Sequence, residues 1–285
     1  MADFNEVFER VEKKYRVTAE QRAALMPLLE QRMEPDKYGK STVTSLYLDT
    51  EGHDLICRSL EKPLYKEKIR LRRYGTFETM SGQNDVFLEL KKKYKGVVYK
   101  RRLRLTWDAA KDFLGGVSYE QACLSHPLND AIQAQESLSP RSVQISREIK
   151  SFGAARGPLS PSMTIACDRT AFARRTAPAD IPLSAAGACA SLAPEGADGL
   201  AGDKLSVGEE SLRITFDDNI RYRDMRVRGR HSHADETPLL PQGESIMEIK
   251  MAASMPLWLS EALSACQIKP TSFSKYGEAF KALCA

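Results

Sequence analysis

The sequence predicts an α+β fold in which an antiparallel β-sheet closes into a barrel-like tunnel and helices pack outside it. The chain has 285 residues, of which 42% are hydrophobic and 28% charged, the composition of a soluble globular protein of one large or two small domains. Several segments alternate apolar and charged residues with the period of two that strands have. Other segments carry apolar residues at helical spacing.

The N-terminal half is expected to hold a helix, four strands and a short helix. Thr18-Ala-Glu-Gln21 has the pattern of a capping box, which predicts a helix through about Arg32. Asp108 is expected to cap a short helix that ends at Gly115 and Gly116. Alternating segments separated by turn residues predict strands over Ser45–Asp49, Lys66–Tyr74, Asp85–Lys93 and Val97–Thr106.

The C-terminal half is expected to continue with helices, three strands and two closing helices. Helical spacing runs from Tyr119 to Phe152, with breaks near Pro127 and Pro140. The predicted strands are Met163–Phe172, Ser211–Asp217 and Ser245–Met251, and the closing helices are Ser254–Cys266 and Ser274–Leu283.

Two segments interrupt this plan. Residues 176–203 are dominated by Ala, Gly, Pro and Ser, which predicts a disordered insertion. Residues 226–242 mix Arg, His, Pro and Gly and are expected to form an exposed loop. Because strand-like segments lie on both sides of each, we expect a single domain over residues 1–285.

The composition excludes several classes of protein. No segment approaches the roughly 20 apolar residues of a membrane-spanning helix, and the first residues lack the pattern of a secretory signal. The six cysteines are scattered without a closely spaced pair, which favours reduced thiols in a cytoplasmic protein over disulfides or a zinc site.

The positive charge is concentrated in one part of the chain. The net charge is only +4, with 42 Lys and Arg against 38 Asp and Glu. Between Lys62 and Arg104, however, there are fourteen basic and four acidic residues. The net charge therefore hides a strongly basic region that could meet a polyanion.

Charged side chains share one face of each predicted strand. Lys68, Arg70 and Arg72 alternate with Ile69 and Leu71. The same alternation places further charged residues on one face of their strands: Glu12, Lys14, Glu89, Lys91, Lys93, Arg102, Arg104, Arg213, Asp217, Glu248 and Lys250. An antiparallel sheet with one solvated face would explain a single strand of this kind. Repeated almost purely ionic faces instead indicate a charged interior, because like charges on neighbouring strands need compensation.

Two interpretations of a charged interior remain open. The carboxylates and bases could pair with one another as a purely structural network. Alternatively, Arg and Lys from several strands could surround phosphate oxygens, with Glu248, Glu89, Glu12 or Asp217 holding a Mg²⁺ or Mn²⁺ ion that bridges the phosphates.

Eight segments in a fixed order resemble a known family. They are Arg10-Val-Glu-Lys-Lys-Tyr15, Ser45-Leu-Tyr-Leu-Asp49, Lys68-Ile-Arg-Leu-Arg72, Phe87-Leu-Glu-Leu-Lys-Lys-Lys93, Asp168-Arg-Thr-Ala-Phe172, Leu212-Arg-Ile-Thr-Phe-Asp217, Glu248-Ile-Lys250 and Ser272-Phe-Ser-Lys-Tyr-Gly277. The chain thereby resembles the VTC-type polyphosphate polymerase domain of the triphosphate tunnel metalloenzyme (CYTH-like) superfamily. Arg10 stands where the wider superfamily often has a glutamate, as in the polymerase branch.

The resemblance implies an enzyme that transfers the γ-phosphate of ATP to a growing polyphosphate chain and releases ADP. Together with strand phase it implies the following site residues. The positively charged residues of the catalytic site would be Lys14, Arg70, Arg72, Lys91, Arg169, Arg213 and Lys275. Further contacts to the substrate would come from Arg58, Lys68, Lys93, Arg102, Arg104, Lys250 and Ser274. Lys100 or Arg101 could take the place of Arg102. The Mn²⁺ or Mg²⁺ ligands would be Glu248, Glu12 and Glu89.

The expected partners follow from this chemistry. They are ATP and inorganic polyphosphate, with no nucleic acid, no membrane-spanning segment in this chain, and room for a separate membrane partner. Two alternatives remain: a hydrolase of tripolyphosphate or nucleoside triphosphates with the same fold, and a polyphosphate-binding module without catalytic activity.

Overall fold

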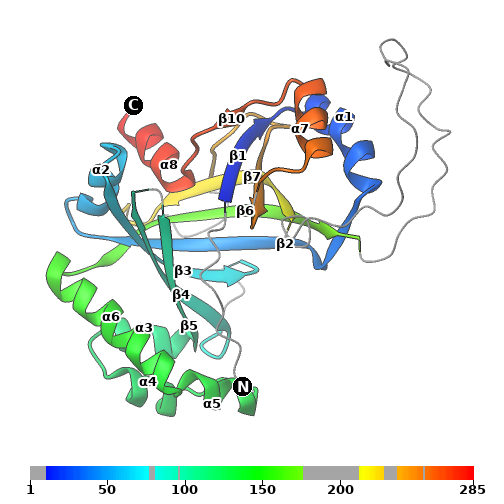
Figure 1. The fold of residues 1–285 in the computed structure, drawn as a ribbon. Coiled ribbons are helices and arrows are strands. Elements are labelled where there is room, and N and C mark those ends of the chain that lie inside the picture. The colour runs from blue at the N-terminus through cyan, green and yellow to red at the C-terminus, as the bar shows by residue number, and fades with distance from the viewer. Residues whose placement is uncertain (1–10, 77–80, 96, 176–211, 228–235, 253) are drawn as a thin grey trace, which may run out of the picture.

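The computed structural model describes residues 11–76, 81–95, 97–175, 212–227, 236–252 and 254–285. In these residues the fold is mixed α+β, with one curved antiparallel sheet and helices on both of its faces (Figure 1). The sheet has ten strands, nine of them in the order β10-β1-β9-β7-β6-β2-β3-β4-β5, while β8 pairs with β7. The α+β fold class is therefore confirmed.

The strands at the centre of the sheet are long, whereas β8 and β10, from the C-terminal part of the chain, are short. Their bounds are β1 Val11–Val17, β2 Met33–Asp49, β3 Tyr65–Tyr74, β4 Asp85–Tyr94, β5 Val97–Thr106, β6 Ser160–Arg174, β7 Arg213–Asp224, β8 Thr237–Pro238, β9 Ser245–Met251 and β10 Pro270–Thr271. All strand pairs are antiparallel. The β2–β6 and β6–β7 pairs each contain register shifts. Irregularities of this kind bend a sheet.

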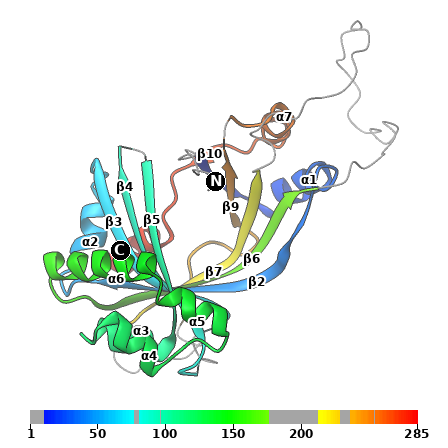
Figure 2. The ribbon, with the colours of Figure 1, turned by 60° about the horizontal axis from the view of Figure 1, so that its bottom comes forward.

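The prediction of a closed barrel is wrong for the described residues. The terminal strands β10 and β5 do not pair with each other, so the sheet is an open, strongly curved layer (Figure 2). The physical reason lies on the concave face, where α2 (Asp54–Leu60) and α8 (Lys275–Cys284) pack against the strands. The predicted packing of helices outside the sheet is confirmed for the helices on its convex face, whereas α2 and α8 lie on the concave face.

Two apolar cores cover the convex face. The helices concerned are α1 Ala19–Glu30, α3 Trp107–Leu114, α4 Tyr119–Ser125, α5 Ala131–Ser137, α6 Pro140–Arg156 and α7 Leu257–Ala265. One core joins β2–β5 to the α3–α6 layer through residues such as Ile69, Leu88 and Phe152. The other joins β1, β7 and β9 to α1 and α7 through residues such as Phe216 and Leu259. Each core buries the apolar phase of its strands.

A third core on the concave face anchors α2 and α8. Tyr276 of α8 stacks on Tyr47 of β2 with ring centroids 4.5 Å apart. The fully buried Asp49 accepts hydrogen bonds from the backbone N–H groups of Leu55 and Ile56, at 2.9 and 3.1 Å, and from the Tyr276 hydroxyl at 2.8 Å. One carboxylate therefore fixes the start of α2 and the position of α8.

Several element boundaries agree with the expectation from sequence, but β2 begins at Met33 rather than Ser45, β7 continues to Asp224, and α2 was not expected. The capping box of Thr18 and Gln21 opens α1, and Ser274 caps α8. The short third helix, however, begins at Trp107, with the Thr106 hydroxyl accepting from the Ala109 N–H at 3.2 Å, so Asp108 is not its cap. The interruption expected after Tyr119 separates α4, α5 and α6.

The two predicted insertions lie partly or wholly outside the described residues. Residues 176–203 lie outside the described residues. Within 226–242, β8 pairs with β7 and the Leu239 N–H donates to the Ile220 carbonyl at 2.7 Å. Among the described helices, none combines the length and apolar character needed to cross a bilayer.

We predict that Asp49→Ala lowers the free energy of unfolding by about 3 kcal/mol, because it leaves buried N–H groups without an acceptor. Urea denaturation followed by circular dichroism measures the change. Tyr276→Phe is the matched control, since it removes one hydrogen bond, keeps the stacked ring and should cost about 1 kcal/mol. Equal losses in the two variants would contradict the role given to Asp49.

Candidate functional site

Charged side chains gather on the concave face, in the phase that the sequence predicts. The apolar residues that alternate with them are buried in the convex cores: Ile69, Leu71, Leu88, Leu90, Leu103, Leu105, Ile214, Phe216, Met247 and Ile249. Cross-strand neighbours on the concave face include Arg70 opposite Glu89 and Glu89 opposite Arg102. The charged side chains form three connected groups.

The first group surrounds the buried Glu89 on β4. Arg70 donates to Glu89 Oε2 through Nε at 2.9 Å and through Nη2 at 2.7 Å. On the other oxygen, Oε1, Arg102 Nε and Lys100 Nζ each lie at 2.7 Å, and Arg72 Nε is 3.9 Å from Oε2. Burial raises the pKa of Glu89, but the surrounding bases outweigh it and hold that pKa far below the ordinary value.

The second group surrounds Asp217 on β7. Arg169 of β6 makes a bidentate pair with Asp217, Nε to Oδ1 at 2.6 Å and Nη2 to Oδ2 at 2.8 Å, and Lys275 at the start of α8 also contacts Oδ2. Burial raises the pKa of Asp217, but Lys275 and Arg169 outweigh it and lower that pKa. Asp217 thus joins β6, β7 and α8 through charge-assisted hydrogen bonds.

The third group lies on β1 and β9. Lys14 Nζ is 3.3 Å from Glu248 Oε1 and 3.7 Å from Glu12 Oε1. Lys250 Nζ is 3.5 Å from Glu248 Oε2. Burial raises the pKa of Glu248, but Lys14, Lys275 and Lys250 outweigh it and leave that pKa well below its usual value.

Curvature of the sheet brings the third group opposite β3 and β4. Lys68 donates to the Ser274 hydroxyl at 2.6 Å, which links β3 to the start of α8. Burial lowers the pKa of Lys91, and the charges of Glu12 on β1 (raising it) and of Lys14 (lowering it further) also act on it. Strands that are far apart in the order of the sheet therefore face one site.

Two bases in this region have no carboxylate close enough to neutralise them. Within the described residues, neither Lys68 nor Lys91 makes an ion pair. Burial lowers the pKa of Lys68 to about 8, and the neighbouring charges of Lys14 and Lys91 contribute to the decrease. Ammonium groups held close together repel one another, and a bound anion would relieve that repulsion.

Tyr47 belongs to this site, although sequence reasoning did not select it. Its hydroxyl accepts from Arg70 Nη1 at 3.0 Å. Burial raises the pKa of the Tyr47 phenol, but Arg70, Lys68 and Arg72 outweigh it and lower the pKa to about 8. Tyr47 lies on the same face of β2 as Ser45, so strand phase could have placed it in the site. Its mainly apolar ring made it look like a core residue instead.

Four predicted residues lie away from these groups. Arg58 is exposed on α2, and Arg213 is half exposed and contacts Asp36. Arg104 Nε donates to Asp85 at 2.8 Å, and the Arg104 guanidinium also lies over the ring of Phe87. Lys93 is exposed near the end of β4. The remaining predicted residues lie in the three groups or on the strand and helix that connect them.

The carboxylates suit a metal only if a ligand supplies further oxygens. No group of three or more His, Cys, Asp or Glu side chains that could hold an ion is found in the described part of the chain. Glu89 is already engaged by four bases, whereas Glu248 makes only contacts of 3.3 Å or more. Glu248 and Glu12 therefore fit an ion of the kind that one or two carboxylates and phosphate oxygens hold together.

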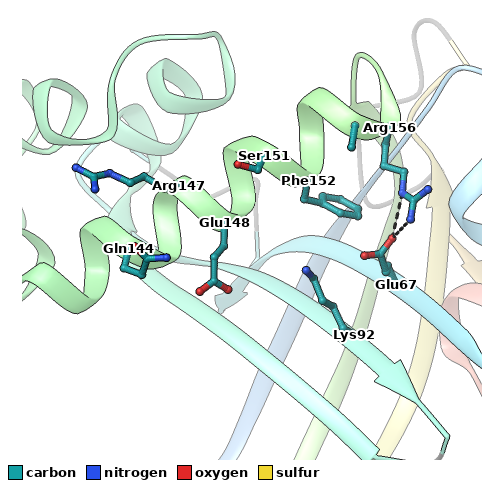
Figure 3. A pocket seen from close by; sticks show the side chains of 9 residues that line it. Glu67, Lys92, Gln144, Arg147, Glu148, Ser151, Phe152 and Arg156 are labelled. Carbon is teal, nitrogen blue, oxygen red and sulfur yellow. Dashed lines mark hydrogen bonds and ion pairs between the residues drawn. The ribbon is translucent and has the colours of Figure 1, made fainter.

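A shallow pocket on the convex side is separate from this site. It lies between α6 and β3–β4 and is lined by Glu67, Lys92, Gln144, Arg147, Glu148, Ser151, Phe152, Ala155 and Arg156 (Figure 3). Arg156 Nη2 pairs with Glu67 at 2.6 Å, and Arg101 pairs with Glu148 at 2.8 Å. Both carboxylates are thus satisfied by neighbouring arginines, which gives this pocket a structural role in docking α6.

We predict that the stability of the protein falls as the pH drops below about 4, the ordinary pKa of an aspartate. The lowered pKa of Asp217 means that its contribution is complete above that value and is lost as the carboxylate becomes protonated in the folded state. Urea denaturation between pH 3 and 7 measures this.

Asp217→Asn should lower the free energy of unfolding at neutral pH by about 3 kcal/mol, because Arg169 and Lys275 lose their counter-charge. The variant should also lose part of the acid dependence. Asp112→Asn, at an exposed pair with His126, is the control and should change neither property. An unaltered acid dependence in Asp217→Asn would assign the effect to other carboxylates.

Comparison with solved structures finds distant likenesses, including the following three. A candidate adenylate cyclase from Vibrio parahaemolyticus is 8% identical, with a TM-score of 0.40 over 96% of this chain and 99% of that one. A Pyrococcus horikoshii protein is 11% identical, with a TM-score of 0.38 over 95% and 99%. The Schizosaccharomyces pombe Mediator head module gives 9% identity and a TM-score of 0.35 over 90% of each chain. TM-scores this low support no conclusion about function.

A family model covers most of the sequence, whereas no curated protein sequence matches it. The model is that of the VTC domain, and it matches residues 9–180 and 205–284. The matched ranges include all three charged groups of the concave face and the helix that carries Ser274 and Lys275. The chain therefore belongs to the VTC domain family.

Proposed function

We propose that the protein is an ATP-dependent polyphosphate polymerase and that the concave face is its active site. In the proposed reaction the bond between the β- and γ-phosphates of ATP breaks, the γ-phosphate joins the end of a polyphosphate chain, and ADP leaves. Membership of the VTC domain family supports an activity on nucleotides or polyphosphate. The charge arrangement described below supports the more specific assignment.

The observation that carries the proposal is a row of lysines on β3, β4 and β5 that face one another, of which only Lys100 contacts a carboxylate, that of Glu89, within the described residues. Lys66 lies opposite Lys93, Lys68 opposite Lys91, and Lys91 opposite Lys100 in the strand register. Like charges in such positions destabilise a sheet. A linear polyanion that runs along the concave face would remove this repulsion, and phosphate oxygens match both the point charges of Lys and the planar donors of Arg.

Polar atoms without partners point to the same ligand. Arg72 Nε and Thr215 Oγ1 are buried on concave-face residues and have no hydrogen-bond partner within the described residues. Buried polar groups are normally satisfied, so these atoms call for a ligand or water. Ser274 and Lys275 add the N-terminus of α8, where partial positive charge favours phosphate.

The protein's own residues would bind and orient both substrates. Arg70, Arg72 and Arg102, held by Glu89, and Arg169 and Lys275, held by Asp217, would fix phosphate oxygens at positions that the buried carboxylates define. Phosphoryl transfer requires alignment and charge neutralisation more than covalent chemistry by the protein. Lys14, Lys68, Lys91 and Lys250 would supply most of that neutralisation.

We propose that Glu248, assisted by Glu12, holds Mn²⁺ or Mg²⁺ against the bound phosphates. Such an ion polarises phosphoryl oxygens and neutralises negative charge as the phosphoryl group is transferred. Glu89 was expected as a third ligand, but its engagement by four bases favours a role in positioning arginines. A cytoplasmic location, where ATP is supplied, is part of this proposal.

A single assay tests the proposal against its two alternatives. Purified protein is incubated with ATP and Mn²⁺, and the products are resolved by gel electrophoresis and by free-phosphate release. Long polyphosphate together with ADP is the expected result. Free phosphate without chains would identify a hydrolase, and intact ATP together with polyphosphate binding would identify a module without catalytic activity.

We predict that Glu248→Gln abolishes metal-dependent turnover, because the neutral amide cannot replace a carboxylate ligand for a hard cation. Electron paramagnetic resonance of Mn²⁺ in the presence of a polyphosphate should show binding in the wild type and a loss of at least tenfold in the variant. Glu244→Gln, at a carboxylate that pairs with Arg16, is the matched control and should retain both properties. Normal Mn²⁺ binding by Glu248→Gln would remove this residue from the metal site.

We predict that kcat/KM for ATP falls as the pH rises through about 8, because Lys68 loses its charge there. Lys68→Arg keeps the charge and should weaken this alkaline decrease. Lys100, whose pKa burial lowers to about 8 despite the charge of Glu89, and Tyr47 titrate in the same range. Lys100→Arg and Tyr47→Phe are therefore measured in parallel, and a pH profile changed only by one of these two would contradict the assignment to Lys68.

A further inference from the structure

An exposed cluster of aromatic, aliphatic and basic side chains lies where β3 begins and the β4–β5 hairpin turns. We call it the hairpin-tip patch. Its apolar members and their exposed fractions are Leu64 71%, Tyr65 37%, Tyr94 46%, Val98 45% and Tyr99 50%. This end of the strands is opposite to the end where β5 leads into α3 (Figure 2). Apolar groups gathered in this way on a soluble fold indicate a contact surface.

The patch extends the convex face of the sheet beyond its helical cover. Strand phase places Tyr65, Tyr94 and Tyr99 on the same side as Ile69, Leu90 and Leu103, which the α3–α6 layer buries. The C-terminal part of α6 covers the strands as far as Glu67 and Lys92, where Arg156 pairs with Glu67 and Glu67 also accepts a hydrogen bond from the Tyr65 hydroxyl. The tyrosines beyond that point are therefore left exposed.

The patch has a defined shape. The Lys95 N–H donates to the Leu64 carbonyl at 3.0 Å, which joins the hairpin turn to the connection between α2 and β3. The rings of Tyr65 and Tyr94 pack edge to face, with centroids 6.5 Å apart and planes at 62°. Tyr65, Tyr94 and Tyr99 consequently project from the convex side of these strand ends, while Val98 lies on the opposite side, across from Lys93.

The charges around the patch are almost all of one sign. Lys62, Lys92 and Lys95 surround the apolar groups, and Lys66 and Lys93 lie on the concave side of the same strand ends. Of the nearby acids, Glu67 is buried and paired with Arg156, and Glu61 stands at the margin beside Lys62. This arrangement favours a partner with a negative surface.

We propose that the hairpin-tip patch docks the protein on the surface of an anionic lipid bilayer. Tyrosine rings favour the interface between headgroups and acyl chains, where aliphatic side chains such as Leu64 and Val98 can also insert. Lysines close to such a surface gain from its negative potential. The hairpin-tip patch combines both features on one projecting edge, and the proposal does not depend on the reaction that the concave face catalyses.

A single-stranded nucleic acid fits this surface less well. Successive bases stack on free aromatic faces, but Lys95 Nζ lies 5.4 Å from the centroid of Tyr94 and the edge-to-face packing engages Tyr65 as well. The aliphatic side chains of Leu64 and Val98 cannot form hydrogen bonds with the edges of bases. Binding of nucleic acid is therefore an outcome that the test must exclude.

Vesicle co-sedimentation of the purified full chain tests the proposal in the absence of ATP. Vesicles of phosphatidylcholine alone are compared with vesicles that also contain phosphatidylserine, at low and high ionic strength. We expect binding to the anionic vesicles only, weakened by salt because screening shortens the reach of the lysine charges. Equal binding to both kinds of vesicle, or no binding to either, would overturn the proposal.

Two double variants separate the two contributions. Lys62→Glu/Lys95→Glu should lower partitioning onto anionic vesicles at least tenfold, and Leu64→Ser/Tyr99→Ser should lower it at a fixed lipid charge. The control is Leu124→Ser/Ile132→Ser, which removes similarly exposed apolar side chains from α4 and α5 and should bind as the wild type does. Thermal unfolding checks that each variant is folded.

The same variants are titrated with a fluorescent single-stranded oligonucleotide and assayed for ATP turnover in solution. Binding of the oligonucleotide that exceeds vesicle binding and is lost in Leu64→Ser/Tyr99→Ser would overturn the lipid assignment. Vesicle binding that persists in both patch variants would overturn it as well. Turnover reports separately on the concave face, so the failure of either proposal is distinguishable from failure of the other.

Discussion

Two buried carboxylates allow this fold to keep many basic side chains on one concave surface. Glu89 and Asp217 each lie among bases that come from different strands, and each accepts short contacts on both of its oxygens. Without them, neighbouring arginines and lysines would repel one another in a region of low dielectric constant. The carboxylates lower that repulsion without removing the excess of positive charge, so the surface remains attractive to a polyanion. The same residues that stabilise the fold therefore also set the positions of the donors that a phosphate would meet.

The periodicity of the sequence was sufficient to predict which face of each strand is charged. An alternation of two residues fixes side-chain direction in a strand whatever its neighbours are, so Arg70, Arg72, Lys91 and Glu248 lie on the concave face as expected. Local capping chemistry likewise placed the starts of α1 and α8. These features depend on a few adjacent residues, and local sequence determines them.

Features that depend on contacts between distant segments were less accessible. The openness of the sheet follows from the packing of α2 and α8 on its concave side, which no local pattern reveals. Arg213 has the expected phase, yet it contacts Asp36 of β2, which lies on the other side of β6 from β7 and comes within reach only after folding. Tyr47 was missed because a ring that packs on Tyr276 is indistinguishable in sequence from an ordinary core residue, although its hydroxyl contacts Arg70. The sequence likewise did not reveal that Tyr94 and Tyr99 are exposed beside the lysines of β4, because exposed and core tyrosines look alike in sequence.

The separation of the convex face into two apolar cores has a mechanical consequence. One core carries the strands of Arg70, Glu89 and Lys91, and the other carries those of Lys14 and Glu248. The third core joins the two halves around α2 and α8, and polar contacts such as the bond from Lys68 to Ser274 add to it across the concavity. Contacts between charged or polar groups in a partly hydrated space are soft compared with packed side chains. A ligand that engages bases from both halves would therefore act as a brace, and the width of the concavity would be set by what it holds.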